Sequence, residues 1–185
     1  YALVLAVTDR EAAAARRGGI SAFIVPTDSP GFQIAGVIRM FGSAGGDEAV
    51  IHLDNVRVSD AHILGEVHQG FKVGMLGVGL GKLYNAGKAI GLGNWALNKA
   101  AAQIRERRAF GGAIGDQQGV LFPIAESAME LRAARLMAIQ AAREVENGNP
   151  GAVEVAMAKA FASEASLRAI YRSIQVHGAT GFTNE

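Results

Sequence analysis

The sequence contains no cysteine, and this absence removes several kinds of chemistry. Disulfide bonds, thiolate metal sites and cysteine nucleophiles are all excluded. Histidine is also scarce, and no two histidines have the short spacing that is typical of a metal site on one helix. The sequence therefore predicts no metal centre. The four histidines are His52, His62, His68 and His177.

A surplus of charge of one sign is missing as well. The 185 residues carry 18 lysines and arginines against 17 aspartates and glutamates, which gives a net charge of +1. The charges are interspersed, so the basic stripe of a nucleic-acid-binding protein is absent. No uninterrupted apolar run reaches about 18 residues, so no membrane-spanning helix is predicted. Half of the residues are hydrophobic, which favours a packed globular core.

The first part of the sequence, up to about residue 68, has the pattern of β-strands joined by turns. Runs of β-prone residues alternate with turns that contain glycine and proline. The first run lacks the basic flank and the cleavage signal of a secretory leader, so a strand is expected there. The expected strands occupy 1–7, 20–26, 32–38 and, as one or two strands, 48–58, with a loop at 42–47.

After Gly70 the hydrophobic period changes to three and four residues, which is the spacing of amphipathic helices. Helix stop signals stand at 147–150 and at Gly178. We therefore expect an α+β fold in which a partial antiparallel β-domain (1–68) precedes a long-helix antiparallel bundle (69–185). The expected helices span about 71–108, 118–146 and 152–177.

The first of these helices contains seven glycines between residues 74 and 93. Each glycine inside a helix costs up to about 1 kcal/mol relative to alanine. Their number indicates that another helix or a ligand approaches the backbone closely. The alternative is a sequence rich in small residues that has no such constraint.

Two short motifs stand where the expected helices end or begin. The first is R-E-R-R-A-F-G-G-A-I-G-D-Q-Q at 105–118, and the second is Q-V-H-G-A-T-G-F at 175–182. Arg107 and Arg108 are expected at a helix C-terminus, where a cation is favoured. Phe110 can lie against a flat ring, and Gln118 opens a helix whose free N–H groups favour an anion such as a pyrophosphate.

Each motif also has a purely structural explanation. An arginine at the end of a helix commonly caps that helix, and a glycine-rich turn after Gln175 is most often a C-cap. Neither motif is specific alone. Their spacing, with a continuous pair of helices between them, favours a shared nucleotide site.

The two motifs resemble the R-x-x-F-G-x-x-I-x-x-x-Q and Q-x-x-G-G-x-G segments of the acyl-CoA dehydrogenase family. Stretches of the family's middle β-domain are similar to I-S-A-F-I-V-P at 20–26 and D-N-V-R-V at 54–58, so the resemblance covers nearly the whole chain. In that family these motifs contact the FAD of a neighbouring subunit. The resemblance implies that FAD is contacted by Arg107, Phe110, Gln118, Gln175, Gly178 and Ala179.

The resemblance also implies an acyl-CoA site and a reaction. Gly79 and Lys82 match the ends of a stretch that lines the acyl-CoA site, although the family usually has an acid and an arginine there. The family dehydrogenates an acyl-CoA thioester between its α and β carbons, with a carboxylate taking the α-proton and flavin N5 taking a hydride. The base is expected beyond Glu185, since the position used in one branch is Gly81, which has no side chain. No catalytic residue is therefore expected here, and the chain is interpreted as a fragment that is inactive alone.

Further expectations come with the family. They are a homodimer or homotetramer, electron transfer to an electron-transferring flavoprotein, and a role in fatty acid metabolism. The place would be the bacterial cytoplasm or, in a eukaryote, the mitochondrial matrix. The chain is more similar to the branch that acts on longer acyl chains. The alternatives are an acyl-CoA oxidase or flavin monooxygenase relative, or a non-catalytic helical module for oligomerisation.

Overall fold

The computed structural model describes residues 1–42, 45–149 and 151–183. Parts of the expected loop at 42–47 and of the stop signal at 147–150, as well as Glu185, lie outside these residues. The chain forms two compact units, Tyr1–Gly77 and Val78–Glu185. The expected domain boundary after residue 68 precedes this division, because the first two turns of the long helix belong to the first unit.

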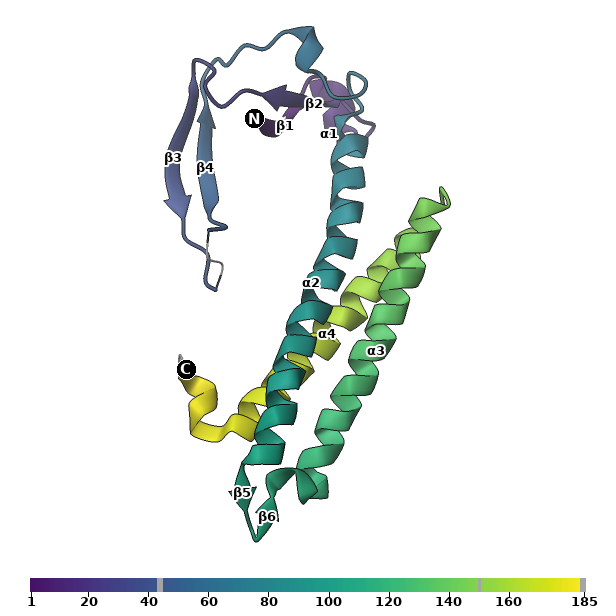
Figure 1. Cartoon of the computed structure of the whole chain (residues 1–185). Coiled ribbons are helices and arrows are strands. Elements are labelled where there is room, and N and C mark those ends of the chain that lie inside the picture. Colours follow the sequence, from purple (N-terminus) through teal and green to yellow (C-terminus); the bar gives the residue numbers. More distant parts are fainter. Residues whose placement is uncertain (43–44, 150, 184–185) are drawn as a thin grey trace. The chain divides into compact units, whose positions relative to one another are not determined.

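The first unit contains two antiparallel strand pairs (Figure 1). Asp9 begins the short helix between the first two strands, since its carboxylate accepts the Ala12 N–H at 2.9 Å. The strand expectations are confirmed, except that the region 48–58 forms one strand that ends at Leu53. The elements are β1 (Ala2–Val7), α1 (Arg10–Ala14), β2 (Ile20–Val25), β3 (Phe32–Ile38), β4 (Glu48–Leu53) and the 3₁₀ turn η1 (Asp60–His62).

A hydroxyl cluster ties the start of the long helix to β2. Ser21 is fully buried, and its Oγ lies 2.7 Å from Thr8 Oγ1 and accepts the His68 N–H at 2.8 Å. A Cβ at Gly70 would lie 2.2 Å from the Ala22 nitrogen, so the helix can begin here only with glycine.

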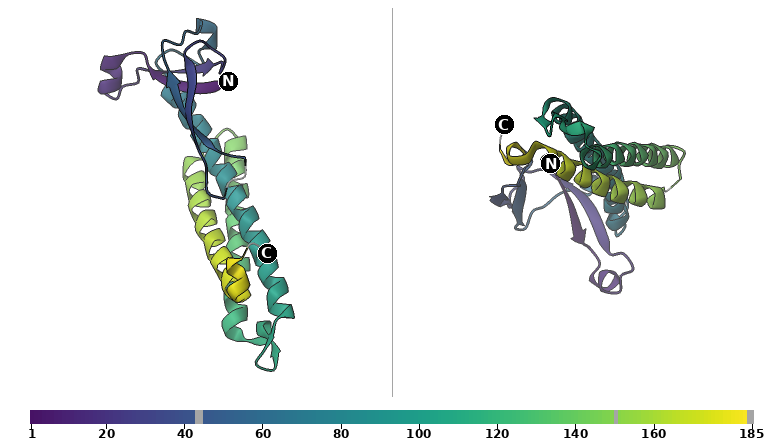
Figure 2. Two further views of the ribbon diagram at one scale, coloured as in Figure 1. Left: turned by 90° about the vertical axis from the view of Figure 1, so that its left-hand side faces the viewer. Right: turned by 90° about the horizontal axis from the view of Figure 1, so that it is seen from below.

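The second unit is a bundle of three long helices, which Figure 2 shows lying along one another. The expected helix bounds are confirmed to within two residues, and so is the α+β class. The helices are α2 (Gly70–Glu106), of which the part from Val78 belongs to this unit, α3 (Gln118–Glu146) and α4 (Ala152–His177). Shorter elements join or end them: the hairpin strands β5 (Arg108–Ala109) and β6 (Gly112–Ala113), and the 3₁₀ turns η2 (Ile114–Asp116) and η3 (Gly178–Phe182).

Small residues let the three helices approach closely. A Cβ at Gly93 on α2 would lie 2.7 Å from Leu131 on α3 and 2.6 Å from Ser166 on α4. The Ser166 hydroxyl donates to the Ala89 carbonyl, and seven residues later Ser173 donates to the Ala96 carbonyl at 3.0 Å. These contacts fix the register of α4 against α2.

Close approach to the seven glycines of α2 was expected, and the described structure shows it for only some of them. Gly74 and Gly93 have close neighbours, as predicted. A Cβ at the other five glycines of the run would meet nothing within 4 Å in the described structure. Those positions therefore leave open space along α2.

Candidate functional site

The first motif forms a tight β-hairpin rather than the end of a helix. Helix α2 ends at Glu106, Arg107 follows it, and Arg108 is the first residue of β5. Arg107 stands at the C-terminus of α2, as expected, since its N–H donates to the Gln103 carbonyl at 2.9 Å, whereas the expectation was wrong for Arg108, which lies on a strand. Helical periodicity fails here because a two-residue turn between two-residue strands contains too few residues to show a period of its own.

The tip of this hairpin carries an exposed aromatic ring in an unfavourable backbone conformation. Phe110 and Gly111 both have positive φ angles, 54° and 84°, as a type I′ turn requires. Gly111 adopts this conformation freely, whereas Phe110 does not. Phe110 is also 92% exposed. A strained, solvent-exposed aromatic residue gains little from its own fold, and such positions favour a binding role.

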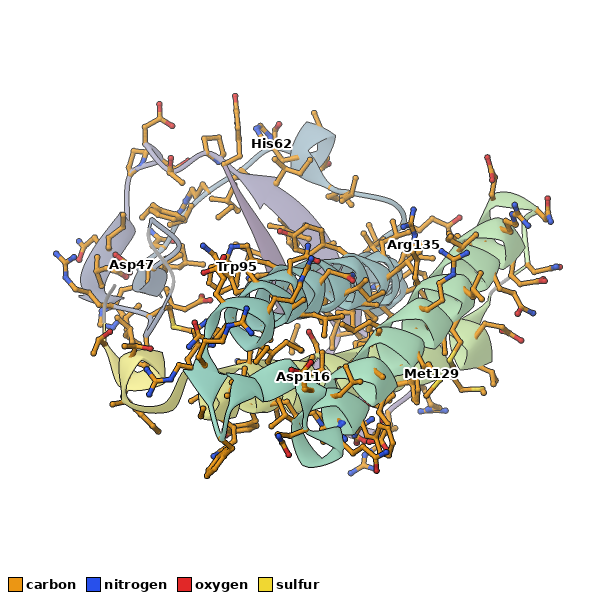
Figure 3. The ribbon with its side chains drawn as sticks, turned by 60° about the horizontal axis from the view of Figure 1, so that its bottom comes forward. Asp47, His62, Trp95, Asp116, Met129 and Arg135 are labelled. Carbon is orange, nitrogen blue, oxygen red and sulfur yellow. The ribbon has the colours of Figure 1, made fainter. Side chains whose placement is uncertain are left out.

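The hairpin is fixed to the neighbouring helices. The Ile114 N–H donates to the Arg107 carbonyl at 2.9 Å, and the Ala113 N–H donates to Asp116 Oδ2 at 3.0 Å. Asp116 lies in the segment that joins the hairpin to α3 (Figure 3). A Cβ at Gly115 would lie 3.0 Å from the Ile104 carbonyl, so this glycine lets the segment lie close against α2.

A pocket of about 440 Å³ opens between the hairpin, the start of α3 and the end of α4. Its wall combines a mostly apolar lining with three polar side chains, those of Gln117, Arg172 and Gln175. Such a lining is typical of sites for small molecules and cofactors. The apolar part comes from Phe110, Ile114, Val120, Pro123, Ile124 and Val176.

The N-terminus of α3 contributes to this pocket. The helix has 29 residues and begins at Gln118, and Gly119 in its first turn lines the pocket. The first N–H groups of a helix have no partner within the helix, and the helix dipole places partial positive charge there. This end of the pocket therefore favours an anionic group.

The structure brings together only some of the residues expected from the sequence. Phe110 and Gln175, which are 65 positions apart, line the same pocket. Arg107 is exposed at the base of the hairpin. Gln118 does not line the pocket, whereas its neighbour Gln117 does.

The turn after Gln175 has the geometry of a helix cap. Gly178 has a φ of 61°, and its N–H donates to the Gln175 carbonyl. Both Gly178 and Ala179 are exposed, so their backbone is accessible to a ligand. A Cβ at Gly181 would lie 2.6 Å from the Ile174 carbonyl, so η3 turns back onto α4.

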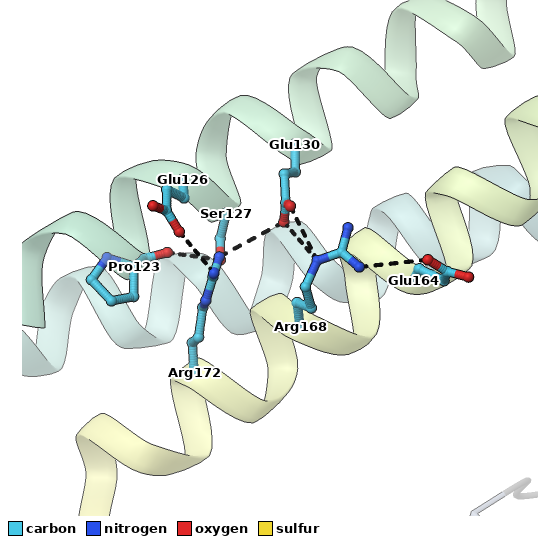
Figure 4. A network of polar contacts seen from close by, with 7 residues as sticks. All are labelled: Pro123, Glu126, Ser127, Glu130, Glu164, Arg168 and Arg172. Atoms are coloured by element: carbon cyan, nitrogen blue, oxygen red, sulfur yellow. Dashed lines mark hydrogen bonds and ion pairs between the residues drawn. The ribbon is translucent and has the colours of Figure 1, made fainter.

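Arg172 was missed by the sequence interpretation. It lies one helical turn before Gln175, on the same face of α4, and an i, i+3 search from that glutamine would have found it. Its Nη2 donates to Glu126 Oε2 at 2.8 Å and its Nη1 to Ser127 Oγ at 2.9 Å (Figure 4). Ser127 is fully buried and in turn donates to the Pro123 carbonyl at 3.1 Å.

The same network extends one turn along α4. Arg168 Nε lies 3.1 Å from both oxygens of Glu130, and Arg168 Nη1 lies 3.6 Å from Glu164 Oε2. The hydrogen bond with Glu130 raises the pKa of Arg168, so this guanidinium stays charged. Glu130 also lies 3.7 Å from Arg172 and so faces both arginines.

Gly79 and Lys82 lie on α2, far from this pocket. They are 27 and 24 residues before the end of the helix at Glu106, which corresponds to about 40 Å and about 36 Å. Lys82 is exposed, and a Cβ at Gly79 would meet nothing within 4 Å. A ligand of these two residues would therefore occupy a second site.

Residues 1–42, 45–149 and 151–183 contain no group of three or more histidines and carboxylates that could hold a metal ion. Across the same residues, no helix is both long and apolar enough to cross a membrane.

The described residues from Val78 on form a long-helix bundle with a mostly apolar pocket beside the hairpin, the start of α3 and the end of α4. Residues 68–185 match the family model described as "Acyl-CoA dehydrogenase, C-terminal domain". The chain belongs to the acyl-CoA dehydrogenase family.

Individual relatives agree with this assignment. A probable acyl-CoA dehydrogenase of Bacillus subtilis, YngJ, is 39% identical over 166 residues, covering 90% of this chain and 44% of the relative. The human mitochondrial short-chain specific acyl-CoA dehydrogenase is 35% identical over 184 residues, which cover 100% of this chain and 44% of the relative. The solved structure of butyryl-CoA dehydrogenase from Megasphaera elsdenii has a TM-score of 0.91 at 29% identity. The match covers 98% of this chain and 46% of that structure. The chain thus spans less than half the length of these relatives.

Proposed function

We propose that this chain is part of an FAD-dependent acyl-CoA dehydrogenase that dehydrogenates an acyl-CoA thioester between its α and β carbons. The single observation that carries the proposal is the convergence of Phe110 and Gln175 on one pocket. These residues come from the two motifs that resemble the FAD-binding segments of the family. Because 65 residues separate them, sequence proximity alone does not explain their meeting.

The residues around the pocket fit a dinucleotide. The exposed ring of Phe110 can stack on a flat heterocycle, and the first turn of α3 attracts a phosphate. Arg107 would pair with the pyrophosphate, and the side-chain amides of Gln118 and Gln175 would bind polar edges of the nucleotide. The exposed turn at Gly178 and Ala179 would let the backbone approach the same ligand.

FAD, when bound, supplies the hydride acceptor of the proposed reaction. The residues of this chain bind and orient it and supply no base. Gly79 and Lys82 belong to the proposed acyl-CoA site on α2. There the open space beside Gly79 would admit the substrate, and the exposed ammonium group of Lys82 would favour its phosphates.

The similarity now favours a short acyl chain. The sequence pattern predicts the branch that acts on longer acyl chains, whereas two of the relatives described above are named for short-chain and butyryl-CoA substrates. We extend the proposal to a homo-oligomer that passes electrons to an electron-transferring flavoprotein in fatty acid metabolism. The cellular location of the protein would be the bacterial cytoplasm or the mitochondrial matrix.

The test uses the full-length protein that carries this chain. We expect the purified protein to show the flavin absorption band, and we expect short acyl-CoA thioesters to bleach that band without oxygen while the enoyl-CoA product forms. Rapid reoxidation by oxygen would identify an acyl-CoA oxidase instead. A protein without flavin absorption, even after incubation with FAD, would show the proposal to be wrong.

A further inference from the structure

Arg172 occupies the boundary between the pocket and the polar network of α3 and α4. It lines the pocket together with Phe110 and Gln175, and 26% of its side chain is exposed. Two of its five N–H groups are used, one by Glu126 and one by Ser127. The remaining three have no hydrogen-bond partner among the described residues.

The surroundings of Arg172 neutralise its charge. Glu126 and Glu130 lie 2.8 and 3.7 Å away, and Glu130 is shared with Arg168. Together with Glu164, the network holds three carboxylates against two guanidinium groups, so its net charge is negative. A phosphate beside Arg172 would be repelled by these carboxylates, whereas an uncharged hydroxyl or ring nitrogen would not.

We infer that Arg172 is a further cofactor-contacting residue, which donates hydrogen bonds to an uncharged part of the dinucleotide next to its pyrophosphate. The inference rests on the proposed function of the pocket. Arg107 and the first turn of α3 would hold the pyrophosphate, and the carboxylates around Arg172 would keep it away from this guanidinium. Ser127 and Glu126 hold the guanidinium plane in place, so little side-chain entropy is lost on binding.

The experiment compares Arg172→Met with Arg168→Met in the full-length protein. Arg168 is a matched control, because it lies one turn away on the same helix, shares Glu130 and does not line the pocket. FAD affinity is measured by fluorescence titration of the deflavinated protein at low and at high salt. We expect Arg172→Met to weaken FAD binding about tenfold and Arg168→Met to change it less than about twofold.

Salt dependence separates Arg172 from a phosphate contact. The loss caused by Arg172→Met should be the same at both salt concentrations, whereas the loss caused by Arg107→Ala should shrink at high salt. Arg172→Lys keeps an ion pair with Glu126 but loses the planar donors, so it should fold normally and still bind FAD less tightly. Competition by adenosine and by riboflavin identifies which uncharged part Arg172 contacts.

The outcomes separate this inference from the proposed function. Equal FAD affinities of Arg172→Met and Arg168→Met would leave Arg172 a purely structural role and overturn the inference. A loss that shrinks with salt would overturn it too, because Arg172 would then contact the pyrophosphate. In both cases the proposed function stands, provided that the unmutated protein binds FAD and that Arg107→Ala weakens this binding. A parent without affinity for FAD would overturn both.

Discussion

At the scale of single residues, Phe110 has a conformation that opposes stability. A left-handed backbone conformation costs a non-glycine residue about 1–3 kcal/mol, and the exposed ring recovers none of this by burial. Asparagine tolerates the same conformation well. We therefore expect Phe110→Asn to raise the thermal midpoint of the FAD-free protein by a few degrees while lowering FAD affinity about tenfold.

Thermal melts with and without FAD check this prediction. The two effects should have opposite signs, because the ring contributes to binding and not to the fold. A variant that is both less stable and unchanged in FAD affinity would show that Phe110 packs within the chain.

Arg107 and Arg108 are distinguished by their places in the hairpin. Arg107 lies at the junction of α2 and the hairpin, since its N–H donates to the Gln103 carbonyl and its carbonyl accepts the Ile114 N–H, whereas Arg108 is paired with Ala113 in the hairpin. The resemblance to the family assigns the pyrophosphate contact to Arg107 and not to Arg108. We expect Arg107→Ala to cost about 1.5–3 kcal/mol of FAD binding and Arg108→Ala to cost little.

The measurement is the ratio of flavin to protein absorbance after dialysis of the full-length protein. Equal flavin retention by Arg107→Ala and the parent would contradict the assignment. Loss of flavin by Arg108→Ala alone would place the other face of the hairpin towards the ligand.

At the scale of helices and strands, serines on α4 connect it to α2. Ser173 is buried and donates to the Ala96 carbonyl of another helix, whereas Ser163 donates to the Lys159 carbonyl of its own helix. We expect Ser173→Ala to lower the free energy of unfolding by about 1 kcal/mol, because it loses a buried interhelical hydrogen bond. Ser163→Ala should be neutral or slightly stabilising, since alanine favours a helix.

Urea unfolding of both variants checks this prediction. The two substitutions remove the same atom from the same helix, so their difference isolates the contact with α2. Equal unfolding midpoints would mean that the hydrogen bond between Ser173 and Ala96 contributes nothing to the free energy of unfolding.

The sequence predicted the long helices well and the elements around the pocket less well. Amphipathic periodicity over 26 residues or more predicted α3 and α4, and the stop signals at 147–150 and Gly178 predicted about where they end. The hairpin was missed because its strands are two residues long. Arg172 was missed because a charged residue on a helix is usually solvated, and only the packing of α3 against α4 shows its partners.

At the scale of the whole molecule, α3 carries an apolar stripe that this chain leaves uncovered. Phe122, Met129 and Leu136 are spaced seven residues apart, and each is at least 55% exposed. A regular exposed stripe of this kind favours contact with another copy of the chain. We expect the full-length protein to be a dimer or tetramer and Leu136→Glu to reduce its assembly.

Light scattering after size-exclusion chromatography measures the mass. Arg135→Gln, a change at an exposed residue about 100° around α3 from Leu136, is the control and should leave the mass unchanged. A monomeric parent would contradict the prediction, and so would an unchanged mass for Leu136→Glu.

The first two turns of α2 also determine where the protein can be divided. Gly70 lies against β2, and a Cβ at Gly74 would lie 3.0 Å from the Leu5 side chain. A fragment cut at residue 68 loses both contacts, although the sequence pattern changes there. A fragment that ends at Gly77 keeps them. Limited proteolysis should therefore spare residues 68–77, and any recombinant β-domain should include the beginning of a helix that is mostly part of the other unit.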